Sequence, residues 1–180
     1  MTRLAFTTIG VLYEPRKHPR SEGFSKRSPL VNKLAEASDG FIARSVFNYE
    51  TEVSSWGDAV LPSFVPADRL ANVAQTLSLW KDMESAYAFA YHGALHTEAM
   101  RRRTEWFHAP DHPNYAAWWV ADDHQPDFVE AAQALETLHL NGSSPAGFNF
   151  TQPFDAQGRP SRLDPALVKA KARRNATAQA

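Results

Sequence analysis

With 180 residues, of which 43% are hydrophobic and 12% aromatic, the chain is long enough for one globular domain with a buried core. Its formal net charge of −1 gives no long-range field that would attract nucleic acid or an anionic membrane, so we expect neither as a partner. The absence of cysteine excludes disulfides, thiolate catalysis and cysteine-ligated metal centres. Because no secretory signal or membrane-spanning apolar run is apparent, we expect a soluble cytoplasmic protein.

The first part of the chain predicts a strand, a helix, a second strand and a long irregular loop. Residues 4–12 are rich in β-branched and large apolar side chains, and 41–49 carry apolar residues on both faces. Apolar residues recur at helical spacing over about 25–37, where Pro29 is expected to mark the start of the regular helix. Residues 50–71 predict a lid or binding loop that is dispensable for folding, with an ordered structural excursion as the alternative.

The second part predicts a strand, a long helix, a strand, a further helix and a short edge strand or clasp, at residues 72–80, 82–107, 114–120, 127–140 and 148–154. Asp82 is placed to cap the long helix. We therefore expect one domain over residues 1–152, with the insertion at 50–71. The remainder, 153–180, has no large apolar side chain after Val168 and predicts a flexible tail.

This order of elements is that of a ferredoxin-like α+β fold, an antiparallel sheet with helices on one face. The other face of the sheet would then need a cover. A second copy of the chain could supply it, in a homodimer whose two sheets close into an α/β barrel.

The long helix carries the candidate catalytic residues. A rotation of 100° per residue places Phe89, His96, Met100, Arg103 and Phe107 on one buried stripe. Inward-facing polar groups are costly unless they are paired or meet a ligand, so we take His96 and Arg103 as candidate catalytic residues. The alternative is a core histidine and arginine that are both hydrogen-bonded within the protein.

Aromatic residues and a second histidine around this helix are candidates for binding a planar substrate, or for filling a core. The candidate binding residues are Phe89, His92, Met100, Trp80, Trp106 and Trp119. His92 and His96 have the i, i+4 spacing of shared metal binding, but the sequence indicates no third ligand.

Four stretches carry a resemblance to a known family: LSLWKDMES at 77–85, MRRRTEWF at 100–107, AAWWVADDHQP at 116–126 and SSPAGFNF at 143–150, with the helical His96 between the first two. They resemble an uncharacterised bacterial family of the dimeric α/β-barrel superfamily, related to antibiotic-biosynthesis monooxygenases. The resemblance covers residues 4–150 except the 50–71 segment.

The resemblance implies a small-molecule oxidoreductase, a cofactor-free or heme-dependent monooxygenase acting on an aromatic or polyketide-like metabolite between helix and sheet. His96 would serve as acid/base or as the ligand of heme iron, and Arg103 would stabilise an anionic intermediate. The alternatives are a non-catalytic dimer that binds a hydrophobic metabolite or heme, and a cofactor-free cyclase or isomerase.

Overall fold

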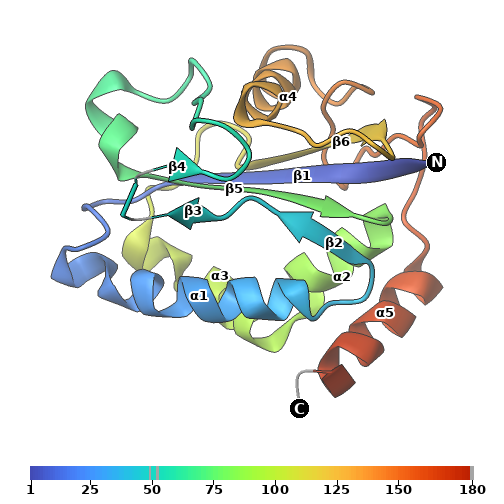
Figure 1. Cartoon of the computed structure of the whole chain (residues 1–180), viewed down its shortest axis with the longest axis horizontal. Coiled ribbons are helices and arrows are strands. Elements are labelled where there is room, and N and C mark those ends of the chain that lie inside the picture. The colour runs from blue at the N-terminus through green and yellow to red at the C-terminus, as the bar shows by residue number, and fades with distance from the viewer. Residues whose placement is uncertain (49, 52, 179–180) are drawn as a thin grey trace.

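The computed structural model describes residues 1–48, 50–51 and 53–178, and it describes only the backbone of residues 94–97, 99 and 100. Its centre is a four-stranded antiparallel sheet in the order β2-β5-β1-β6 (Figure 1). In chain order these strands are β1 (Thr2–Val11), β2 (Phe41–Arg44), β5 (Val73–Trp80) and β6 (Tyr115–Ala121). Since this is the strand order of a ferredoxin-like sheet, the predicted α+β fold is confirmed.

Alternate residues of β1 supply two separate hydrophobic cores, one on each face of the sheet. Leu4 and Phe6 belong to the core beneath the helices α1 (Glu22–Glu36) and α2 (Met83–His92). Ala5 and Ile9 belong to the core on the opposite face. Figure 1 shows α1, α2 and α3 (Ala94–Trp106) on one side of the sheet and α4 (Phe128–Asn141) on the other. We call the side of α1, α2 and α3 the helix-facing side.

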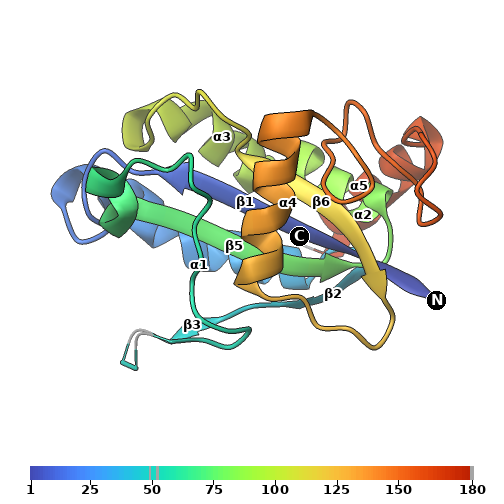
Figure 2. The same cartoon turned by 90° about the horizontal axis from the view of Figure 1, so that it is seen from above.

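The opposite face is covered by the chain itself. The helix α4 (Phe128–Asn141) crosses the sheet there (Figure 2) and packs with Trp56 and Val65 in one buried cluster. The sequence-based expectation that this face lacks a cover is therefore wrong, because α4 lies here and not beside α2. Closing two sheets face to face would require α4 to move aside. The homodimer remains a prediction, but it no longer follows from an uncovered sheet face. Light scattering, which measures whether the particle has the mass of one chain or of two, tests it.

The segment 50–71 is part of the second core and not a free loop. Trp56 is 7% exposed, Val65 is 5% exposed and Pro62 is fully buried. The predicted second strand is also shorter than expected. It ends at Arg44, and β3 (Phe47–Asn48) pairs with β4 (Val53–Ser54) in a separate ribbon. A short 3₁₀ helix, η2 (Ala67–Asn72), leads into β5. The segment is the ordered structural excursion that was the alternative.

The predicted long helix is two helices. Asp82 caps α2 as expected, since its Oδ1 accepts the backbone N–H of Ser85 at 2.8 Å. Gly93 then takes an extended conformation, and α3 runs over Ala94–Trp106. Glycine is among the least favourable residues inside a helix but is accepted at an N-cap. The break resets the helical rotation, so the single stripe predicted to run from Phe89 to Phe107 is wrong, and Arg103, which was predicted to be buried, is exposed.

Two further helix predictions need correction. The helix α1 begins at Glu22 and passes through Pro29, whose exposed ring does not disturb the packed side. The tail, predicted to be flexible, forms α5 (Pro165–Ala178), which packs against α2 (Figure 1). Lys171 on α5 is buried and reaches two carboxylates, at 3.4 Å from Asp39 and 3.1 Å from Asp82. No described helix is long and apolar enough to cross a membrane.

Candidate functional site

A row of polar side chains crosses the helix-facing side of the sheet. Tyr115 on β6, Thr8 on β1 and Thr76 on β5 are aligned in register, and we call them the polar row. The hydroxyls of Thr8 and Thr76 lie 2.8 Å apart and hydrogen-bond to each other. Thr76 is exposed although β5 is an inner strand, whereas Leu4 and Phe6 on the same side are buried. Solvent therefore reaches the sheet at this row.

Tyrosines from α2 gather next to one end of the polar row. Tyr87 and Tyr91 lie one helical turn apart and stack at 4.6 Å between ring centroids. Phe150 links them to the sheet, since its ring stacks on Tyr115 at 5.4 Å and meets Tyr87 edge-on at 5.5 Å. The backbone N–H of Phe150 donates to the Tyr115 hydroxyl at 3.1 Å. We call these four residues the aromatic cluster.

The electrostatic setting keeps Tyr91 protonated. Burial raises the pKa of its phenol, and the neighbouring hydroxyls of Tyr115 and Tyr87 raise it further, while the positive charge of Arg103 acts in the opposite direction. The residue is nevertheless 44% exposed, so a ligand can approach it. At neutral pH, Tyr91 is thus an O–H donor on which the positive charge of Arg103 acts.

The two candidate catalytic residues are placed differently from the prediction. The side chains of His96 and Met100 lie outside the described residues, although both are part of α3. Arg103 is exposed on α3, and its positive charge acts to lower the pKa of the Tyr91 phenol on α2. His92 is exposed at the end of α2, with its ring 5.9 Å from that of Tyr87.

The predicted aromatic residues do not form one wall. Trp80 and Phe89 stack at 5.3 Å inside the core under α2. The indole N–H of Trp119 donates to the carbonyl of Phe154 at 2.8 Å. Trp106 is 3% exposed and packs against the Phe24 ring of α1. Trp80, Phe89 and Trp119 thus belong to the core on the helix-facing side, whereas Trp106 packs separately against α1.

Sequence reasoning missed the tyrosines and threonines that make this site. A signal was present, because Tyr87 and Tyr91 have the i, i+4 spacing that stacks two rings on one helix face. In β1, the alternation of Leu4 and Phe6 continues with Thr8, a polar residue where an apolar one belongs. Only the register of the strands brings Thr8 beside Thr76 and Tyr115.

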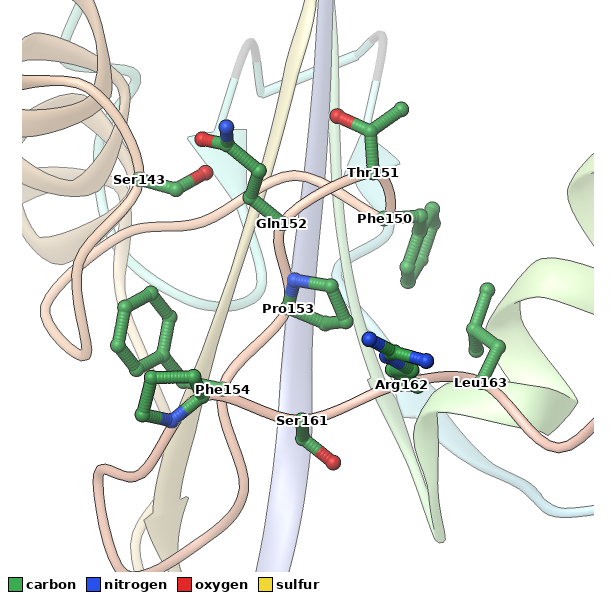
Figure 3. Close-up of a pocket in the computed structure, with 10 residues that line it drawn as sticks. Ser143, Phe150, Thr151, Gln152, Pro153, Phe154, Ser161, Arg162 and Leu163 are labelled. Atoms are coloured by element: carbon green, nitrogen blue, oxygen red, sulfur yellow. The ribbon is translucent and has the colours of Figure 1, made fainter.

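A hollow of about 440 Å³ adjoins the aromatic cluster through Phe150 (Figure 3). It is formed by residues 143–163, the irregular segment after α4, which we call the clasp. Arg162 and Leu163 lie on one side of the hollow and Ser143 and Gln152 on the other. A neighbouring hollow of about 300 Å³ is lined by Tyr115 and shares Ser143 and Gln152. The clasp thus leaves accessible space next to Tyr115 and Phe150, within the size range of small-molecule sites.

Among the residues whose side chains are described, no three His, Asp or Glu residues gather closely enough to hold a metal ion. Iron binding by His96, which the family resemblance implies, concerns a side chain outside the described residues. The described part of the site offers tyrosine hydroxyls and a guanidinium, which are groups that stabilise an organic anion.

Comparison with known proteins gives a family match over most of the chain. Residues 3–164 match the family described as "Domain of unknown function (DUF3291)". No curated protein matches the sequence. Among solved structures, the chain is similar to the NE2512 protein of unknown function from Nitrosomonas europaea, at 15% identity and a TM-score of 0.43, over 70% of this chain and 96% of that chain. The fold is therefore assigned from the strand order of this chain and not from this likeness.

Proposed function

Since this chain belongs to the DUF3291 family, whose description names no reaction, we propose from the site that it binds a small planar aromatic metabolite bearing an enolate or phenolate oxygen. The observation that supports this is the aromatic cluster, which carries the Tyr91 and Tyr115 hydroxyls next to the polar row that solvent reaches. The positive charge of Arg103 acts on the Tyr91 phenol. A protonated phenol and a guanidinium both stabilise an oxyanion. The rings of the aromatic cluster supply a flat apolar contact for the rest of the ligand.

The reaction that we propose is cofactor-free monooxygenation. A CH₂ group next to an aromatic ketone loses a proton and gives an enolate, whose oxygen the Tyr91 and Tyr115 hydroxyls would hold. The CH₂ group then becomes a carbonyl, with one atom of O₂ incorporated and the other released in water. No external reductant is needed, because the substrate supplies the electrons. His96, on the neighbouring helix, is our proposed base.

The binding proposal predicts a loss of affinity when the donor is removed. Tyr91→Phe is expected to weaken binding of 2,4-dinitro-1-naphtholate, a planar phenolate at neutral pH, about tenfold, or ~1.4 kcal/mol, because one hydrogen bond to the anionic oxygen is lost. Quenching of tryptophan fluorescence by the naphtholate measures the effect. Thr177→Val removes an exposed hydroxyl on α5, outside the aromatic cluster and the polar row, and is the control. Equal affinity of Tyr91→Phe and wild type, with both proteins folded, would contradict the site.

The reaction is tested separately with anthrone, a tricyclic ketone that carries the required CH₂ group. We expect O₂ consumption and anthraquinone absorbance above the spontaneous rate, and a large decrease of both in His96→Ala. Binding without O₂ consumption would favour the non-catalytic binding dimer. A spectral change without O₂ consumption would favour a cyclase or isomerase. A Soret band on addition of hemin that is lost in His96→Ala would favour heme binding.

A further inference from the structure

A second site lies at the far end of β1, where three segments meet. The backbone N–H groups of Leu12 and Tyr13 donate to the carbonyls of Asn72 and Trp106, both at 2.9 Å. The N–H of His108 donates to the carbonyl of Val11, also at 2.9 Å. These bonds fix the loop after β1, the end of η2 and the residues after α3 against one another. The side chains at this corner are therefore held by backbone structure.

Cationic and aromatic groups stack at this corner. The guanidinium of Arg20 lies 3.8 Å from the centre of the Tyr13 ring, and the His108 imidazole lies 4.2 Å from the same ring. The Nε of Arg20 donates to the backbone carbonyl of Glu105 at 3.3 Å. Arg69 is half-buried in η2, the helix whose last residue, Asn72, is hydrogen-bonded to Leu12 at this corner. Tyr13, Arg20, Arg69 and His108 together form what we call the basic corner.

The arginines of the basic corner have no ion-pair partner among the described residues. In the described part of the chain, neither Arg20 nor Arg69 forms an ion pair with a carboxylate. Glu14, the acidic residue of this loop, pairs with neither of them. By contrast, Arg3, Arg44 and Arg159 each contact an Asp or Glu within 3 Å. Burial lowers the pKa of His108, and the charges of Arg69 and Arg20 lower it further, so the imidazole is neutral at pH 7.

We propose that the basic corner binds the dianionic phosphate group of a small phosphomonoester. Arg20 and Arg69 supply two guanidinium groups, whose planar N–H pairs match phosphate oxygens. A neutral His108 adds one N–H donor, and the Tyr13 ring keeps Arg20 in place. A dianion compensates both charges, whereas a phosphodiester compensates only one. The site is separate from the aromatic cluster and serves a ligand or regulator of a different chemical class.

The test is a titration with phenyl phosphate at pH 7.5 and constant ionic strength, with chloride as the replaced anion. We expect the backbone amide signals of Tyr13 and His108 to shift in ¹H–¹⁵N spectra and to saturate. Arg69→Gln and Arg20→Gln are each expected to weaken binding at least tenfold, because one charge-assisted contact is lost. Arg173→Gln, on the exposed side of α5, is the matched control and should bind as wild type does.

Three outcomes would overturn the proposal. One is a set of shifts no larger than those caused by chloride. Another is unchanged affinity in both Arg69→Gln and Arg20→Gln. The last is equal or tighter binding of dimethyl phosphate or of a single-stranded oligonucleotide, which would assign the basic corner to phosphodiesters and nucleic acid. If inorganic phosphate binds as tightly as phenyl phosphate, the basic corner is still a phosphate site, and its ligand is the free ion.

Discussion

Trp56→Ala is expected to lower the free energy of unfolding by about 3–5 kcal/mol, because it removes a large aromatic side chain from a packed core. Trp56 is 7% exposed and lies in the cluster that α4 forms with the sheet. Urea denaturation followed by far-UV circular dichroism measures the loss. Val53→Ala, at a 47% exposed position close by in sequence, should change stability by less than about 0.5 kcal/mol.

Replacing residues 50–71 with a short turn extends this prediction. Since the segment supplies Trp56, Val65 and the buried Pro62, its removal should abolish the cooperative unfolding transition. A shortened protein that still unfolds cooperatively, or a Trp56→Ala variant as stable as wild type, would show that α4 covers the sheet without help from this segment.

Lys171→Ala is the second substitution for which we expect a large effect, a loss of about 2 kcal/mol. The Lys171 side chain is 8% exposed and lies between two carboxylates, and its truncation leaves both without this partner. The loss is smaller than for a fully buried pair, because Asp39 and Asp82 keep 25% and 30% exposure and Asp39 retains Arg174. Lys169→Ala, on the exposed side of α5, is the control.

The same contact predicts a change in acid stability. Burial by itself would raise the pKa of Asp39, but the hydrogen bond from Arg174 and the charge of Lys171 outweigh it and hold that pKa below its ordinary value. Asp39 therefore stabilises the fold above the unfolded-state pKa of about 3.9, and this contribution is lost as the pH falls through the lower folded-state pKa. In Lys171→Met we expect a smaller loss of stability between pH 5 and pH 2. An unchanged pH profile would mean that Arg174 alone sets the pKa of Asp39.

Local signals predicted most of the sheet and the ends of several helices. Apolar runs, rich in β-branched and large side chains at residues 4–12, placed β1 and β6 within a few residues of their observed bounds, and Asp82 marked the start of α2. The cover of the second sheet face could not be predicted in this way. An amphipathic helix such as α4 shows that it has an apolar side, but its sequence does not show against which face of a sheet that side packs.

The site and the C-terminal helix were harder for two further reasons. The stripe that led to His96 and Arg103 assumed one uninterrupted helix, and a single residue, Gly93, removes that assumption. In α5, the buried positions Val168, Lys171 and Asn175 have helical spacing, but two of the three are polar. A search for apolar periodicity therefore overlooks this stripe. Lys171 pairs with the Asp39 carboxylate, and the side-chain oxygen of Asn175 accepts the Asp39 backbone N–H.

The position of β1 between β5 and β6 has a consequence for the order of folding. Within this domain β1 is the first strand to be synthesised and becomes an inner strand, yet the partners of Leu4 are Trp80 and Trp119, 76 and 115 residues further along the chain. Neither edge of β1 can be paired until those distant segments have been synthesised. Closing such long loops costs entropy before any strand contact forms, which slows folding of a domain of this size. Until β6 is made, the nascent chain thus carries an apolar strand with an unpaired edge, a stage at which it is most prone to aggregate or to need a chaperone.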